Sequence, residues 1–219
     1  MWRLARRGLS ALIIVRGLSA LKAARGFSAI TAALVLAGSV PAAAQFSESY
    51  NFLKAVREKD GGKATEALDK PGNTIVNTRD SDTGDTALHI VTKRSDLTWM
   101  GFLIGKGANA NAKDSAGNTP LIIATISRFA EGVDLLTKIK VPVDTQNRLG
   151  ETALLKAVQN RDITSARLLV EAGANPDIAD SSGATARAIA SSDPRAASIA
   201  KLFKDLPVRS ARPVQGPSL

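Results

Sequence analysis

Short apolar stretches alternate with polar turns through most of this chain, and they recur at a fixed spacing. Leu88, Leu121 and Leu154 each open an apolar stretch, and the interval between them is constant at 33. Within a stretch the apolar residues fall on one helical face and do not alternate as in a strand. A second apolar stretch follows each one after a polar break. The pattern therefore predicts pairs of short helices that repeat with this period.

A glycine and a threonine mark the start of each unit in the same register. The glycines are Gly84, Gly117, Gly150 and Gly183, and the threonines two positions later are Thr86, Thr119, Thr152 and Thr185. Glycine allows a positive φ in the polar turn. A threonine hydroxyl can accept a hydrogen bond from a free amide in the first turn of a helix, which stabilises it by about 1 kcal/mol. We therefore expect each first helix to begin at this threonine.

This register divides the chain into five units. Three full units span about residues 81–113, 114–146 and 147–179, between a degenerate unit at about 47–80 and a final one at about 180–206. Such units contact only their neighbours, so the predicted fold is an all-α repeat solenoid. In the final unit Arg187 replaces the core leucine, which suits an array end that faces water. The proline-containing tail, residues 207–219, is expected to be disordered.

Two units depart from the pattern. In the first, we expect a helix over residues 47–59 that Asp60-Gly61-Gly62 breaks, followed by a short helix at about 63–69. In the middle unit, Lys140-Val-Pro-Val-Asp144 replaces the Gly-Ala-Asn that ends the second helix in the neighbouring units. Because Pro142 restricts the residue before it, this helix is expected to end without a glycine cap, about one residue early, and to fray.

The turn and helix motifs resemble those of the ankyrin repeat family. The matching segments are Gly84-Asp-Thr-Ala-Leu-His89, Gly117-Asn-Thr-Pro-Leu121 and Gly150-Glu-Thr-Ala-Leu154, with Gly107-Ala-Asn and Gly173-Ala-Asn at the helix ends. The resemblance covers about residues 47–206. It implies turns that project from stacked antiparallel helix pairs, and a concave protein-binding face made by the turns and first helices. It also implies that His89 bonds locally and stiffens its turn.

The resemblance implies that a band of side chains on the turns and first helices contacts a partner. We call this set the contact band: Asp82, Thr83, Asp85, Ser115, Ala116, Asn118, Arg148, Leu149 and Glu151 beside the turns, and Lys93, Arg94, Ile126, Ser127, Lys156, Gln159 and Asn160 on the first helices. Any single one of them is more often an ordinary solvated residue, so the prediction applies to the band as a whole. Exposed Ile126 and Leu149, near the centre, would supply apolar anchors within a polar rim.

Residues 1–44 follow a different pattern. Six basic residues and no acidic ones precede or flank an uncharged apolar run at residues 27–40, and Ala42 and Ala44 stand just before Gln45. A basic region, an apolar core and an Ala-x-Ala motif are typical of a secretory signal peptide. The sequence therefore predicts cleavage between Ala44 and Gln45 and a periplasmic or secreted mature protein.

Three other interpretations of this leader stay open. A leader without acids also fits an organellar transit peptide, although such peptides need no apolar run that ends in Ala-x-Ala. An uncleaved anchor over residues 27–44 is long enough to span a bilayer, but Gly38 and Pro41 favour processing. The pair Arg6-Arg7 suggests a twin-arginine signal, yet it lies far from the apolar run.

The net positive charge of the chain lies mostly in the leader, residues 1–44. The chain carries 29 basic and 20 acidic residues, and six of the basic ones lie in residues 1–44. The remaining 23 basic residues face 20 acidic ones, which is an ordinary solvated surface. Nucleic-acid binding would therefore rest on charge that mostly leaves with the leader.

Little catalytic chemistry can be assembled from this sequence. It has no cysteine, and His89 is the only histidine, so neither a nucleophile and base pair nor a common zinc site is expected. Asp80, Asp82 and Asp85 lack the spacing of a calcium loop and are expected to be solvated turn carboxylates. Trp99 is expected to be partly covered. No metal or cofactor is predicted.

The sequence thus predicts a non-enzymatic, monomeric protein-interaction module that is exported to the cell envelope and binds a protein partner. It predicts no nucleic-acid ligand, and no membrane attachment after cleavage. The alternative is an accessory protein that stabilises or inhibits an exported enzyme.

Overall fold

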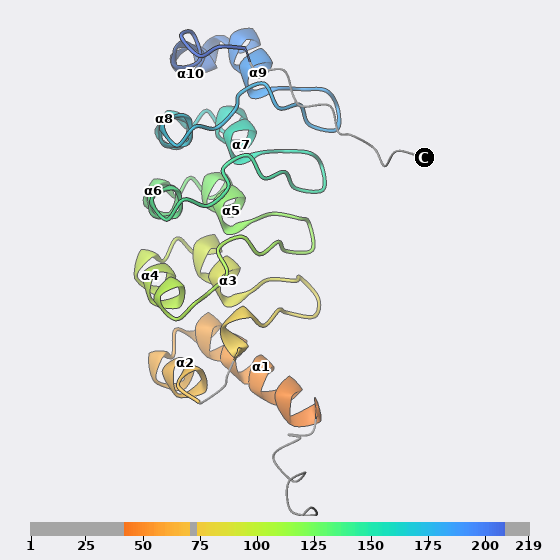
Figure 1. Cartoon of the computed structure of the whole chain (residues 1–219), viewed down its shortest axis with the longest axis vertical. Coiled ribbons are helices and arrows are strands. Elements are labelled where there is room, and N and C mark those ends of the chain that lie inside the picture. The colour runs from red at the N-terminus through yellow and green to blue at the C-terminus, as the bar shows by residue number, and fades with distance from the viewer. Residues whose placement is uncertain (1–41, 71–73, 209–219) are drawn as a thin grey trace, which may run out of the picture. The chain divides into compact units, whose positions relative to one another are not determined.

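Helix pairs stacked in succession make up the fold. The computed structural model describes residues 42–70 and 74–208, in which ten α-helices form five pairs (Figure 1). The first helices are α1 (Ala42–Glu58), α3 (Ala87–Lys93), α5 (Pro120–Ile126), α7 (Ala153–Gln159) and α9 (Ala186–Ser192). The second helices are α2 (Gly61–Leu68), α4 (Leu97–Gly105), α6 (Ala130–Lys138), α8 (Ile163–Glu171) and α10 (Ala197–Leu202). Two 3-10 helices, η1 (Ile75–Asn77) and η2 (Pro194–Ala196), join them.

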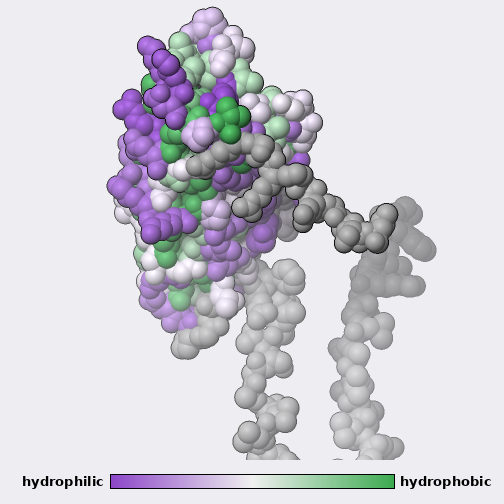
Figure 2. Space-filling view, turned by 45° about the horizontal axis from the view of Figure 1, so that its top comes forward, coloured by the Kyte–Doolittle hydropathy of each residue, from purple (hydrophilic) through white to green (hydrophobic). Residues whose placement is uncertain are grey.

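The two kinds of helix form two layers. Successive first helices contact one another from α1 to α9, and α4, α6, α8 and α10 do the same in the second layer. The loops between units project beyond the first helices, and we call them fingers (Figure 1). Figure 2 shows hydrophilic side chains along the flank of the second helices, with hydrophobic patches between them. Apart from two isolated bridges, the described residues contain no β-structure, so the predicted all-α solenoid is confirmed.

The core lies between the layers, where the repeating leucines point. Leu88 and Leu154 are fully buried and Leu121 is 2% exposed. Burying each leucine side chain contributes about 1.5–3 kcal/mol. The unit period is set by this row, since each first helix must present the same apolar face to its neighbours.

The predicted helix starts are confirmed. Helices α3, α5, α7 and α9 begin at the constant interval of the repeat, each directly after its threonine. The hydroxyl oxygens of Thr119, Thr152 and Thr185 accept hydrogen bonds from the amides three residues on, at 3.4, 3.2 and 3.1 Å. All four turn glycines have positive φ, between 69° and 84°. Turn and cap are therefore local features that the motif encodes.

The predictions for residues 1–41 and 209–219, including the apolar run and most of the tail, lie outside the described residues. The predicted cleavage junction, Ala44–Gln45, falls in the first turn of α1. Across residues 42–70 and 74–208, no helix has both the length and the apolar character that crossing a membrane requires. Cleavage and export stay predictions.

The first unit corrects one expectation. Gly61 and Gly62 do not separate the two helices, because α2 begins at Gly61 itself. The side chain of Asp60 caps α2 by accepting a hydrogen bond from the amide of Lys63 at 3.0 Å. The reversal is made one residue earlier, where Lys59 has a φ of 60°. An aspartate cap thus offsets the low helix propensity of the two glycines.

The middle unit corrects another expectation, because its second helix does not end early. Helix α6 ends at Lys138, in the same repeat position as the last residues of α4 and α8. Lys140 adopts a φ of 60° at the position where Gly107 and Gly173 have 86° and 90°. The next residue, Val141, is buried, and its insertion into the core holds the turn in this conformation despite the lysine side chain.

Replacing Lys140 by glycine is expected to raise the free energy of unfolding by about 0.5–1 kcal/mol. The left-handed conformation costs an L-residue about 1–2 kcal/mol, and part of this gain is lost to the greater freedom of glycine in the unfolded chain. Urea denaturation measures the change. The matched control is Lys138→Gly at the last residue of α6, which should instead destabilise the protein by up to about 1 kcal/mol. A Lys140→Gly protein less stable than wild type would contradict the argument.

The last unit corrects the expectation for Arg187. Its side chain does not face water but is only 23% exposed, and it bonds Asp177 at 2.6 and 3.1 Å. The same guanidinium donates to the backbone oxygen of Phe203 at 2.7 Å, just beyond α10. The pKa of Arg187 is raised by the hydrogen bond to Asp177. The arginine therefore ties the final helix pair to the loop before it, and these hydrogen bonds stabilise the C-terminal end of the array.

Candidate partner-binding surface

An Asx turn shapes each finger. Asp114 Oδ1 accepts hydrogen bonds from the amides of Ala116 and Asn118, and Asn147 Oδ1 does the same for Leu149 and Glu151, all at 2.8–2.9 Å. Because the side chain at the base holds the backbone of the tip, the residues that project from the finger have a fixed orientation.

The first finger is one residue longer between its aspartate and its glycine. Asp80 accepts hydrogen bonds from the amides of Asp82 and Thr83 at 3.0 and 2.9 Å, and its other oxygen pairs with Arg57 at 2.5 Å. The Thr83 amide first, and then Arg57, hold the pKa of Asp80 well below its usual range. Asp80 is thus a structural carboxylate. Among the described residues no three potential metal ligands converge.

Neighbouring fingers are joined by backbone hydrogen bonds. The amides of Ser115, Arg148 and Ser181 donate to the carbonyls of Thr83, Ala116 and Leu149, at 2.9, 3.1 and 2.9 Å respectively. The three bonds are equivalent to one another, because donors and acceptors each recur at the period of the repeat. The fingers therefore form a continuous ladder.

Long side chains join the fingers a second time at their bases. Arg79 donates to the carbonyl of Lys113, Lys113 Nζ to that of Gln146 at 2.8 Å, and Gln146 Nε2 to that of Ala179 at 3.0 Å. This row was not predicted from the sequence. A long polar side chain four or five residues before each of the first three turn glycines is the signal that could have indicated it.

His89 has the local role that the family resemblance implies. Its Nδ1 accepts a hydrogen bond from the amide of Thr86 at 3.2 Å, so Nε2 carries the proton and donates to the carbonyl of Asn118 at 3.1 Å. The residue is fully buried, and burial lowers its pKa. The neutral ring therefore caps α3 and also ties it to the next finger.

Two members of the contact band are not exposed as expected. Asp85 and Glu151 are only 6% and 8% exposed, because the residue after the turn glycine points back toward the first helix. Asp85 pairs there with Lys93 at 2.7 Å, and Glu151 pairs with Lys156 at 2.6 Å. Burial would raise the pKa of Glu151, but hydrogen bonds from Lys156 and Asn147 outweigh it and lower that pKa. Neither carboxylate is a free contact residue.

The rest of the contact band lies at the surface in varying degree. Exposed are Asp82, Thr83, Lys93, Ser115, Ala116, Ile126, Ser127, Arg148, Leu149 and Gln159, while Arg94, Asn118, Lys156 and Asn160 are half-buried. Two of the half-buried residues hold the framework together. Arg94 donates to the carbonyl of Val56, and Asn160 Nδ2 donates to that of Thr125 at 3.3 Å.

The two predicted apolar anchors are exposed. Ile126, at the end of α5, is 45% exposed, and Leu149, in the third finger, is 62% exposed. Because α5 and α7 contact each other and the fingers form one ladder, both side chains belong to the face made by the fingers and first helices. We call it the finger face. Leu97 and Ile139 are similarly exposed, at 43% and 42%, but Leu97 is the first residue of α4 and Ile139 directly follows α6, so both belong to the second layer.

Trp99 is partly covered, as expected. Its ring meets Phe102 edge to face at 5.8 Å, and the guanidinium of Arg94 lies 5.3 Å from the ring centre. Both aromatic residues belong to α4, in the second layer. Trp99 therefore packs within the framework and does not lie on the finger face.

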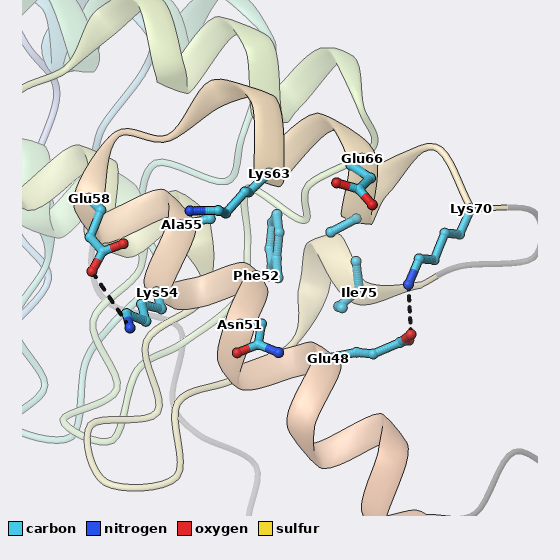
Figure 3. A pocket seen from close by; sticks show the side chains of 11 residues that line it. Glu48, Asn51, Phe52, Lys54, Ala55, Glu58, Lys63, Glu66, Lys70 and Ile75 are labelled. Atoms are coloured by element: carbon cyan, nitrogen blue, oxygen red, sulfur yellow. Dashed lines mark hydrogen bonds and ion pairs between the residues drawn. The ribbon is translucent and has the colours of Figure 1, made fainter.

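A groove of about 410 Å³ lies at the N-terminal end of the described array, between α1 and α2 (Figure 3). Phe52 lines it, and ion pairs stand at its margin, Glu48 with Lys70 at 2.7 Å and Lys54 with Glu58 at 3.9 Å. A second groove of about 400 Å³ lies between α9 and α10. Both are formed by end units and lie away from the contact band.

Comparisons with known proteins agree with this architecture. The family model "Ankyrin repeats (3 copies)" matches residues 42–147, and the model "Ankyrin repeat" matches residues 149–181. Inversin of Mus musculus is 33% identical over 100 residues, 45% of this chain and 9% of inversin, and inversin of Homo sapiens is 32% identical over 120 residues, 54% and 11%. The Nuclear factor NF-kappa-B p110 subunit of Drosophila melanogaster is 40% identical over 50 residues, 23% of this chain and 5% of that protein. The chain thus spans about a tenth of the inversins it matches.

Proposed function

Because the chain belongs to the ankyrin repeat family, we propose that it is an exported, non-enzymatic interaction module that binds a protein in the cell envelope through the finger face. Repeat arrays of this kind bind partners over extended surfaces. The coarser role, a protein-interaction module, follows from the family. The envelope location, the finger face as the site and the monomeric state are our proposals.

The exposure of Ile126 and Leu149 carries the choice of face. Both are large aliphatic side chains left open to water at the central units, on a framework that two rows of hydrogen bonds make rigid. Apolar side chains surrounded by polar residues on a rigid surface are typical binding hot spots, because little conformational entropy is lost on association. Ser115, Ser127 and Gln159 supply the polar surroundings.

Affinity selection from a periplasmic extract tests this face. We expect the Ile126→Asp, Leu149→Asp double variant to recover at least about tenfold less of the partner than wild type, since each buried charge would cost about 1–2 kcal/mol or more. The matched control is Leu97→Asp, Ile139→Asp, which places the same charges on equally exposed aliphatic positions of the other flank. Equal recovery by both variants and wild type would exclude the finger face. A recovered enzyme whose activity changes on binding would favour the accessory role.

Export has its own test. Sequencing the N-terminus of the protein from cells should find Gln45 as the first residue, and cell fractionation should find the protein outside the cytoplasm. Cleavage at this junction would shorten α1 by the first three residues of that helix. A cytoplasmic protein that keeps residues 1–44 would overturn the export proposal while leaving the interaction role intact.

A further inference from the structure

Two ion pairs of the finger face, one on α3 and one on α7, hold their cation toward water and their anion inward. The side chain of Lys93 is 46% exposed and that of its partner Asp85 only 8%. Lys156 is 21% exposed and Glu151 11%. Because the potential at a surface is dominated by the nearest charges, each pair is neutral in sum but positive toward an approaching molecule.

Arg148 adds a cation that no carboxylate neutralises. It is exposed beside Leu149, and among the described residues it makes no ion pair. Arg128, two residues after Ile126, donates to the backbone oxygen of Asn160 and likewise has no carboxylate partner there. Both apolar anchors therefore have an arginine close by in the chain. In the contact band, Asp82 of the first finger is the one exposed carboxylate.

The central unit interrupts this charge pattern. Asn118 stands where the neighbouring units have Asp85 and Glu151, and its side chain is held by Asp114 at 3.2 Å and by Asn147 at 3.0 Å. Ile126 occupies the position of Lys93, and Ile123 that of Lys156. At these three positions the central unit therefore carries no charged side chain, and exposed Ile126 makes it apolar there, whereas Lys93 and Lys156 stand in the units on both sides.

Resting on the proposed interaction role, we infer that this face fits an acidic segment of a protein partner, with an apolar side chain at its centre and carboxylates on both sides. The apolar side chain would pack on Ile126 and Leu149. The carboxylates would accept hydrogen bonds from Lys93 and Arg148. Because Asp85 is already buried, binding at Lys93 would not have to remove more water from that carboxylate. A nucleic acid would match the charge but offers no aliphatic side chain to the anchors.

Three labelled peptides of equal length test the inference against the full chain. They share a Leu-Leu centre and differ only in their flanks, which are all Glu, all Gln or all Lys. Fluorescence anisotropy at low salt should give the Glu peptide a Kd about tenfold or more below that of the Lys peptide, with the Gln peptide between them. Raising the salt to about 0.5 M should remove most of that difference, because surface charges are screened.

Arg148→Glu supplies the variant, because its side chain makes no ion pair whose loss could disturb the fold. This substitution should raise the Kd of the Glu peptide about 3- to 10-fold. Arg167 is an exposed arginine of α8, and Arg167→Glu should leave that Kd unchanged. Failure of all three peptides to bind, equal binding of the Lys peptide, or an inert Arg148→Glu would overturn the inference. So would single-stranded DNA that displaces the Glu peptide at equal concentration.

The two proposals fail separately. If capture of a partner depends on Ile126 and Leu149 but the peptides show no preference for acidic flanks, the finger face is supported as the binding site and the preference for acidic segments is rejected. If capture does not depend on those two anchors, the finger face is rejected as the binding site, whatever the peptides show.

Discussion

Replacing Leu121 by alanine is expected to lower the free energy of unfolding by about 3–5 kcal/mol. Leu121 is 2% exposed in α5, the central first helix, which contacts α3, α6 and α7. Truncation removes the transfer free energy of three carbon atoms and leaves a cavity that helices held on three sides cannot collapse to fill. Urea denaturation followed by circular dichroism gives the value from the midpoint and slope.

The matched control for Leu121→Ala is Leu149→Ala. That leucine is 62% exposed on the third finger, so its truncation should change the free energy of unfolding by about 0.5 kcal/mol or less. An unchanged midpoint for Leu121→Ala would contradict the assignment of this row to the core. A smaller dependence of the free energy of unfolding on urea concentration would instead show that the central unit unfolds separately from its neighbours.

Gly117→Ala is expected to destabilise the protein by about 1–3 kcal/mol more than Gly183→Ala. Both glycines have a φ above 80°, so the conformational cost of alanine is common to the two variants. A Cβ on Gly117 would lie 2.8 Å from the backbone nitrogen of Arg148 in the next finger. On Gly183, in the last described finger, nothing lies within 4 Å.

The difference between the two glycine variants isolates the close approach of one finger to the next. In Gly117→Ala the chain must either break the bond from the Arg148 amide to the Ala116 carbonyl or shift a whole unit, and overpacking of this kind typically costs about 1–3 kcal/mol. Differential scanning calorimetry of both variants beside wild type measures it. Equal losses would show that the ladder yields without cost, and the fingers would then not form a rigid platform.

The site was less predictable than the fold, and the contact band shows where the limit lies. The exposure of Ile126 and Leu149 followed from their positions relative to the turn glycine and the helix end. Asp85 and Glu151 occupy turn positions that look equally open, yet each is turned inward by a lysine on the following helix. Spacing alone does not reveal this pairing, because the lysines lie eight residues away in one unit and five in the other.

The sequence by itself determined the period, the helix starts and the turns. These depend on contacts between near neighbours in the chain, such as a glycine with positive φ and a threonine that caps the helix after it. Only the tertiary structure decided how units fit against each other. It placed Lys140 in a glycine conformation beside buried Val141, made Arg187 a link between the last helices, and joined the fingers into a ladder. Those outcomes depend on contacts between residues that are far apart in the chain, or on packing into the shared core. Only the stacking of the units brings these residues into contact.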